Sequence, residues 1–304
     1  MPSKKRYKAS QDKIKYKLSP DRKTEDRINW FPGHMNKAIK DIKSKLKLID
    51  IVFEIRDARL PLLTHNPALD EAIGNKEKII LLNKSNLADP ESSLLWQKWF
   101  AEQGQNAFFI NAFDFHEAQV ILHQAKELVN QKKQSEQRKL NILVLGLPNT
   151  GKSTLINKFA AKNIAKAADK PGQTRQQQWI KLAANTELLD TPGIMPPRIE
   201  TQEQGLKLAA IHAIPDRIVS DEKAVIYLIE YFLNHKHHHL YDRYKLDLKQ
   251  RDTISILDSI GKNRGCLLKD NQIDYLRVYK IFLQDFREGK LGRHTLETPP
   301  ITVP

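Results

Sequence analysis

The chain has 304 residues and a formal net charge of +14, and 40% of its residues are hydrophobic, which excludes wholesale disorder and predicts about two domains. No apolar run approaches the roughly 18 residues of a membrane span, and a single cysteine excludes an intrachain disulfide framework and a cysteine-based zinc site. We therefore expect a basic cytoplasmic protein without a membrane or disulfide partner, whose charge favours a polyanion as its partner.

Residues 1–27 form a basic arm, with ten basic and four acidic side chains and a net charge of +6. The arm has almost no large apolar residues, which predicts disorder in the free protein. Because Lys and Arg side chains that neutralise phosphates are the main source of nucleic-acid affinity, the arm is a candidate RNA contact. A solvated tail is the alternative. A mitochondrial presequence fits less well, since such segments are Arg-rich and acid-poor and this arm is Lys-rich.

The segment after the arm predicts a lysine-rich helix. Its apolar residues, from Met35 to Ile49, recur at spacings of four and three, which is one face of a helix. Five lysines between Lys37 and Lys47 cover the remaining surface, which is either solvated or turned toward RNA.

Apolar strands are predicted at residues 48–59 and 78–86, and a further strand begins at Phe108. The second strand ends in a near match to NKxD, the sequence by which GTPases read guanine, formed by Asn83, Lys84, Ser85 and Asn86. In NKxD the carboxylate accepts two hydrogen bonds, from guanine N1–H and N2–H₂, which adenine cannot donate. Asn111 and Ala112, after the third strand, are candidates for the loop that contacts the base next.

A phosphate-binding loop follows. Residues 140–145 predict a buried parallel strand, and the next residues read Gly146-Leu-Pro-Asn149-Thr150-Gly151-Lys152-Ser153, with Thr154 opening a predicted helix. This is GxxxxGK[ST] in the strand–loop–helix context that the motif requires. Backbone N–H groups of such a loop surround phosphate oxygens, Lys152 would reach the β- and γ-phosphates, and the Ser153 hydroxyl would ligate Mg²⁺.

Two later segments add to this nucleotide site. Residues 187–190 predict a short strand that ends in Asp190, an acid suited to Mg²⁺, and the N–H of Gly193 is a candidate contact for the γ-phosphate. Thr174, in a polar loop at residues 170–174, is a candidate Mg²⁺ ligand in the triphosphate state. An ordinary loop threonine is the alternative for this position.

The order of the motifs is unusual, because the base-reading segment precedes the phosphate loop, the reverse of the usual GTPase order. A circularly permuted sheet can still form, since it depends on strand adjacency and right-handed crossovers. These motifs stand beside WFPGHM at 30–35, DAR at 57–59, PGQT at 171–174 and GKNRGC at 261–266. Together they resemble the circularly permuted GTPases of the ribosome biogenesis GTPase A (YlqF-type) family, over residues 28–295.

The resemblance implies an α/β fold: a circularly permuted P-loop GTPase at 28–204, with a mostly parallel sheet and helices on both faces. It implies GTP hydrolysis, slow alone and stimulated by the ribosomal subunit, as a switch in late assembly of the large subunit. Its cofactors would be GTP/GDP and Mg²⁺, and its partners the subunit precursor and rRNA, which it would leave on hydrolysis. The alternatives are a P-loop ATPase or kinase, and an RNA-binding module with weakened nucleotide specificity.

Three residues bear on how such an enzyme works. Asn86 replaces the family's Asp and presents a donor in place of the second acceptor, at a cost of about 1–3 kcal/mol. Ile194 replaces the water-positioning Gln of Ras-like enzymes, and the resemblance makes His34 the candidate catalytic residue; a cap or packing contact is its alternative. Asn149 stands where related GTPases with bound K⁺ have an asparagine, although Asn also favours a turn after Pro148.

Residues 205–304 lack strand alternation and predict a small all-α domain, with helices near 224–233, 253–260 and 273–286. The resemblance makes this domain the candidate for binding RNA or the ribosome. His235 and the run 237–239 invite a metal interpretation, but consecutive positions cannot all face one point, and a solvated helix end or an RNA contact fits better. The domain joins the segment after Gly193 directly, so we expect a γ-phosphate-driven shift there to move it.

Overall fold

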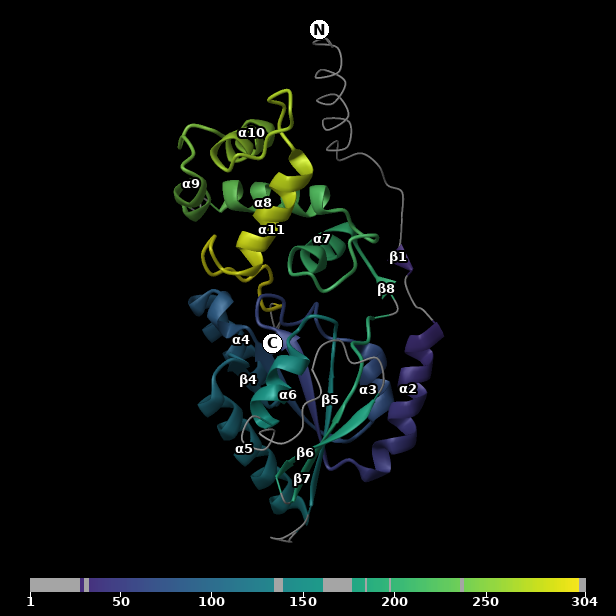
Figure 1. Cartoon of the computed structure of the whole chain (residues 1–304). Coiled ribbons are helices and arrows are strands. Elements are labelled where there is room, and N and C mark those ends of the chain that lie inside the picture. Colours follow the sequence, from purple (N-terminus) through teal and green to yellow (C-terminus); the bar gives the residue numbers. More distant parts are fainter. Residues whose placement is uncertain are drawn as a thin grey trace.

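The computed structural model describes residues 28–29, 33–133, 139–160, 177–183, 185–196, 198–235 and 238–300. The described residues do not include the basic arm at 1–27, the segment 30–32, His237 or the loop that contains Thr174. The side chain of His34 is not described either. Figure 1 shows a sheet flanked by helices, with a second, helical body stacked over one end of the sheet.

A six-stranded sheet with the order β4-β3-β2-β5-β7-β6 forms the larger body. All neighbouring pairs are parallel except β6–β7, which is antiparallel. The strands are β2 (Ile51–Asp57), β3 (Glu77–Asn83), β4 (Ala107–Ile110), β5 (Leu140–Gly146), β6 (Gln178–Ala183) and β7 (Thr186–Asp190). The phosphate-loop strand β5 lies centrally, between β2 and β7, which confirms the mostly parallel sheet in permuted order.

Helices cover both faces, as predicted. On one face, α2 (Gly33–Lys45), α3 (Pro67–Ile73) and α4 (Pro90–Glu102) pack on strand residues such as Val52 and Leu82. On the other, α5 (Phe115–Lys133) and α6 (Lys152–Ala160) pack on residues such as Phe53 and Val144. Because successive side chains of a strand point to opposite faces, strands buried on both sides are apolar throughout. The predicted helix at 35–49 ends at Lys45 and continues as a 3₁₀ turn, η1 (Leu46–Leu48).

The helical body contains α7 (Gln202–Ala210), α8 (Asp221–Asn234), α9 (His239–Tyr244), α10 (Thr253–Asn263) and α11 (Tyr275–Arg287). Side-chain caps begin four of them: Thr201 forms a capping box on α7, Ser220 caps α8, Asp252 caps α10 and Asp274 caps α11. Its apolar core is continuous with the sheet, since Leu147, Ile194 and Leu208 belong to one buried cluster. A two-stranded antiparallel ribbon of β1 (Ile28–Asn29) and β8 (Arg198–Ile199) lies beside the junction (Figure 1).

None of the helices within the described ranges is long and apolar enough to cross a membrane. Among those same residues, one group of His and acidic side chains is compact enough to hold a metal: Glu54, His65 and Asp70. Cations already engage this group, because Lys78 Nζ lies 3.0 Å from Glu54 and 2.7 Å from Asp70. The described histidines of the segment near His235 are not part of this group.

Candidate functional site

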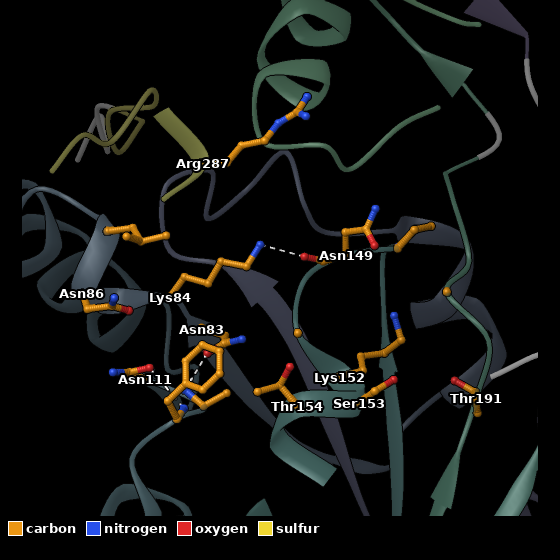
Figure 2. Close-up of a pocket in the computed structure, with 16 residues that line it drawn as sticks. Asn83, Lys84, Asn86, Asn111, Asn149, Lys152, Ser153, Thr154, Thr191 and Arg287 are labelled. Atoms are coloured by element: carbon orange, nitrogen blue, oxygen red, sulfur yellow. Dashed lines mark hydrogen bonds between the residues drawn. The ribbon is translucent and has the colours of Figure 1, made fainter. Parts of the chain in front are cut away.

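A cleft of about 630 Å³ opens at the carboxyl ends of the strands, beneath the helical body (Figure 2). This volume is typical of ligand-binding clefts. The cleft lies where the chain leaves β2 toward one edge of the sheet and returns at β5, the topological switch point at which α/β sheets bind ligands. It is lined by most of the predicted binding residues: Asn83, Lys84, Asn86, Asn111, Ala112, Asn149, Gly151, Lys152, Ser153, Thr154 and Gly193.

Three predicted residues, Thr150, Ser85 and Asp190, are not part of this lining, and for two more, Thr174 and His34, the side chain lies outside the described residues. The side chain of Thr150 is buried and donates to the carbonyl of Leu147 at 3.0 Å, so it supports the loop from within. Ser85 does not line the cleft, and Asp190 lies buried at the end of β7, with 2% of its surface exposed. Thr174 lies outside the described residues. His34 is the second residue of α2, and its side chain also lies outside the described residues.

The phosphate loop holds Lys152 at the first position of α6. Its Nζ donates to the carbonyls of Gly146 at 3.1 Å and Leu147 at 2.6 Å, and 7% of the residue is exposed. Burial lowers the pKa of Lys152 to about 8, although the nearby Asp190 carboxylate favours the charged form and opposes this shift. A polyphosphate entering the loop would raise this pKa again, because it brings negative charge to a poorly solvated ammonium.

Two glycines allow the loop to approach its neighbours closely. A Cβ on Gly151, whose φ is +95°, would lie 2.1 Å from Nδ2 of Asn83. A Cβ on Gly193 would lie 2.7 Å from the backbone nitrogen of Pro148. The backbone N–H of Ile194 then donates to Gly146 at 3.2 Å, and the Ile194 side chain is buried, so the segment after Asp190 is bound to the phosphate loop.

Asn83 joins the phosphate loop to the base-reading loops. Its Nδ2 donates to the carbonyl of Thr150 at 2.8 Å, and its Oδ1 accepts from the N–H of Ala112 at 2.8 Å. The residue is 2% exposed, so both polar ends of the amide are satisfied inside the protein. One side chain at the end of β3 therefore fixes the distance between the phosphate end and the base end of the cleft.

Lys84 also connects the base-reading segment to the phosphate loop. It has a left-handed φ of +62°, and its Nζ donates to the carbonyl of Asn149 at 2.7 Å (Figure 2). Nζ also lies 2.9 Å from the carboxylate of Asp57, which pairs with Arg59 at 2.8 Å. Burial alone would raise the pKa of Asp57, but the Arg59 guanidinium and the Lys84 ammonium hold it well below its usual range. The buried carboxylate is thus the fixed counter-ion of Lys84.

The base end of the cleft is formed by Asn86, on the 3₁₀ turn η2 (Ser85–Leu87), and by Asn111 with its neighbours. Asp89 does not replace the missing carboxylate at position 86. Its side chain accepts from the N–H of Ser92 at 2.7 Å and caps α4. Asn86 and Leu87 are the residues of this turn that line the cleft.

Comparison with known proteins agrees with this geometry. A family model for 50S ribosome-binding GTPases matches residues 141–264. Ribosome biogenesis GTPase A of Bacillus cereus is 45% identical over 278 residues, which cover 90% of this chain and 94% of the relative. The chain belongs to the ribosome biogenesis GTPase A family. This membership confirms the predicted resemblance and fold class, and it supports a GTPase role in ribosome biogenesis.

More distant members of the ribosome biogenesis GTPase A family agree. The Thermotoga maritima relative is 31% identical over 278 residues, 91% of this chain and 97% of its own. The crystal structure of GNP-bound YlqF from T. maritima matches with a TM-score of 0.60 and 27% identity, over 86% of this chain and 98% of that one. A GDP-bound structure of the same protein matches similarly, with a TM-score of 0.59. These neighbours support guanine-nucleotide binding in this member of the family.

The residues that would hold a cation in this family member are oxygen donors. Ser153 lines the cleft, and the Asp190 carboxylate is near enough to Lys152 to shift its pKa. A hydroxyl with a carboxylate is the donor set that Mg²⁺ prefers, so the described part of the site fits this ion. Asn149 donates its Nδ2 to the carbonyl of His212 at 2.7 Å, so the amide oxygen is the atom of this side chain that could ligate a cation.

Five lining residues were not among the predicted binding residues: Leu87, Phe113, Pro148, Thr191 and Arg287. Phe113 and Arg287 are the aromatic and the charged side chain among them. The Phe113 ring is 70% exposed beside the base-contacting loop. Arg287 enters from α11, above Lys84 and Asn149 (Figure 2), and donates to the carbonyls of Ala209 and Ala210 at the end of α7 at 2.8 and 3.0 Å. No motif marks either residue, and Arg287 lies more than a hundred positions from the phosphate loop, so only the fold brings it to the cleft.

Proposed function

We propose that the chain is a GTP-hydrolysing switch in late assembly of the large ribosomal subunit. The GTP form binds rRNA within the subunit precursor, and hydrolysis releases the protein. The single observation that supports this most strongly is Asn83, whose amide joins the phosphate loop to the base loop through two bonds of 2.8 Å. That arrangement holds the two loops at the separation of the phosphates and the base of one nucleotide, which a phosphate-binding turn alone would not do.

In this proposal Ser153, Asp190 and Thr174 hold Mg²⁺, which supplies charge neutralisation at the β- and γ-phosphates when bound. Lys152 binds the same phosphates as an ammonium, and the N–H of Gly193 contacts the γ-phosphate. The guanine base lies between Asn86 and the loop of Asn111 and Ala112. Ser85 and Thr150 contribute to the backbone and the packing of these two loops and do not contact the nucleotide through their side chains.

The water that attacks the γ-phosphate needs a group to orient it, and Ile194 cannot do so because its side chain is buried and apolar. We assign this catalytic role to His34, whose imidazole accepts a hydrogen bond near neutral pH. Asn149 is assigned to K⁺, which would take the place of an arginine finger. Hydrolysis is slow until the ribosomal subunit completes this arrangement.

Two connections transmit a structural change at the phosphate site to the helical body. The segment after Gly193 continues into β8 and α7, and the phosphate-loop residue Asn149 donates to His212 just beyond α7. A shift driven by the γ-phosphate therefore changes how the all-α domain at 205–304 is presented to RNA. The basic arm at 1–27 and the lysines of α2 add phosphate contacts for docking, in the cytoplasm.

Cosedimentation tests this function. Full-length protein is incubated with large-subunit precursors in a non-hydrolysable GTP analogue, in GDP or without nucleotide, and Lys152→Ala serves as a variant that lacks the phosphate ammonium. We expect retention with the analogue, release with GDP and no nucleotide dependence for the variant. Equal retention of the intact protein in all three conditions would remove the switch.

One observation favours a second candidate, an RNA-binding protein with altered nucleotide specificity: Asn86 lines the cleft in place of an acid. An amide can donate to O2 of xanthine, where guanine carries an amino group. Family membership argues against the third alternative, a P-loop ATPase or kinase. Comparing GTP, XTP and ATP in the cosedimentation assay separates these cases, since retention with XTP alone would identify the altered specificity.

A further inference from the structure

The chain after α11 folds back onto the GTPase body and crosses the base-reading turn (Figure 1). We call residues 291–297 the C-terminal strap. Leu291, His294 and Leu296 are buried, with 0%, 2% and 5% of their surfaces exposed, so they pack the strap onto the protein, while Arg293 is exposed. It lies outside the motifs that mark the nucleotide site.

The strap makes four hydrogen bonds to the residues just after Asn83 and Lys84. Arg293 donates through Nε to the carbonyl of Ala88 at 2.8 Å and through Nη2 to the carbonyl of Ser85 at 3.1 Å. The N–H of His294 donates to Leu87 at 3.0 Å, and the Thr295 hydroxyl accepts from the N–H of Asp89 at 3.1 Å. The planar fork of an arginine fixes two carbonyls in one geometry, which a lysine cannot do.

The turn that receives these bonds has little regular structure of its own. It is a single 3₁₀ turn, η2, and it follows Lys84 in a left-handed conformation. The Ser85 carbonyl accepts from the N–H of Ala88 at 3.2 Å within the turn, whereas the Ala88 carbonyl lies at the end of the turn and receives its donor from the strap. Arg293 adds a second donor to Ser85 and supplies the donor to Ala88, and these two residues lie on either side of Asn86, so the strap holds the backbone that carries the Asn86 side chain.

The far end of the strap is anchored in the GTPase body. The carboxylate of Glu297 accepts from the N–H groups of Leu62 and Leu63 at 2.9 and 3.0 Å, and the backbone carbonyl of Glu297 accepts from Trp96 at 3.3 Å. The near end is continuous with α11, the helix that carries Arg287 into the cleft. The strap is thus a mechanical connection between α11 and the base-reading turn.

We propose that Arg293 is a positioning residue for guanine recognition: through the strap, the helical domain holds the base-reading turn in the conformation that binds the base. This inference rests on the proposed nucleotide function and deepens it. It predicts that the strap affects recognition of the base and leaves recognition of the phosphates unchanged, because the phosphate loop makes no hydrogen bond to residues 291–297 among the described contacts.

The test compares a ligand with a base and a ligand without one. Dissociation constants for GDP and for inorganic tripolyphosphate are measured by calorimetry in the presence of Mg²⁺ for the full chain and for Arg293→Ala, Arg293→Lys and Thr295→Val. Arg277→Ala is the matched control, since Arg277 is an exposed arginine of α11 that donates to a carbonyl away from the cleft, on Gly265 at 3.5 Å.

We expect Arg293→Ala to raise the GDP dissociation constant roughly tenfold, the scale for losing charge-assisted hydrogen bonds, with tripolyphosphate unchanged. Arg293→Lys restores the charge without the fork and recovers only part of the loss, and Thr295→Val gives a smaller loss in the same direction. Equal weakening of both ligands, or an Arg277→Ala variant that behaves like Arg293→Ala, would show a general structural effect and overturn the proposal. Unchanged GDP binding overturns it as well. If the unaltered chain binds GDP no better than tripolyphosphate, the proposed nucleotide function itself fails, a different result.

Discussion

Replacing Asn86 by aspartate tests which side chain reads the base. Asn83 cannot take over this role, because both ends of its amide are already bonded, to Thr150 and Ala112. Discrimination at the N1 and N2 edge of guanine therefore depends on residue 86. A carboxylate accepts from both groups, whereas an amide presents a donor to the guanine amino group. Removing that mismatch is worth about 1–3 kcal/mol, or about ten- to hundredfold in affinity.

Calorimetric titration of GDP, XDP and ADP into the full chain and Asn86→Asp measures this effect. The GDP dissociation constant should fall by that factor in the variant, and the XDP constant should rise, because a carboxylate faces xanthine O2. ADP should not change. Asn106→Asp, an exposed residue before β4, is the control for the added charge. If the ratio of GDP to XDP affinity is the same in Asn86→Asp and the unaltered chain, residue 86 does not contact the base and the assignment is refuted.

Three further predictions concern ions and pH. The pKa of Lys152 is lowered to about 8, and a bound polyphosphate raises it, so GDP binding at pH 8 should take up about half a proton. Calorimetry in buffers of different ionisation enthalpy measures this uptake, and zero uptake at pH 8 contradicts the prediction. The affinity for GDP should weaken as the pH rises further. If Asn149 ligates K⁺, hydrolysis should be faster in KCl than in NaCl and the difference should vanish in Asn149→Ala; equal rates in the two salts contradict the assignment. Burial alone would lower the pKa of His65, but hydrogen bonds to Asp70 and Glu54 raise it above 6.5, so its stabilisation is present below pH 6.5 and is lost as pH rises through the raised value. The Tm loss of His65→Gln should thus be larger at pH 6 than at pH 8.5, and a loss independent of pH would argue that packing dominates.

Much of the GTPase body could be predicted because its signals are local. The buried strands are short apolar runs, and the phosphate loop is a contiguous motif between a strand and a helix. The antiparallel strand β6 was not predicted: it is an edge strand in which Lys181 interrupts the apolar residues and Trp179 is 39% exposed, so it contains no long apolar run. The helix that begins before Met35 was predicted too long, since its apolar spacing continues through the 3₁₀ turn η1.

The site was predictable in its residue types and less so in their roles. Ser85 and Thr150 belong to the motifs, but their side chains do not line the cleft, because a motif fixes the backbone path and not which side chain points inward. The contribution of Arg287, the bond from Asn149 to His212 and the strap around Arg293 depend on contacts between residues far apart in sequence. Such contacts leave no periodic or spacing signal in a single sequence. The roles of His34 and Thr174 remain predictions.

Single-turnover hydrolysis tests the central claim most directly. Radiolabelled GTP and ATP are each mixed with excess full-length protein in KCl and Mg²⁺, with and without large ribosomal subunits, and Lys152→Ala and His34→Ala are run in parallel. We predict cleavage of GTP and not ATP, a rate increased by the subunits, and loss of that increase in both variants. Equal cleavage of the two nucleotides, or a GTP rate that subunits do not change, would contradict a guanine-specific switch governed by the ribosome.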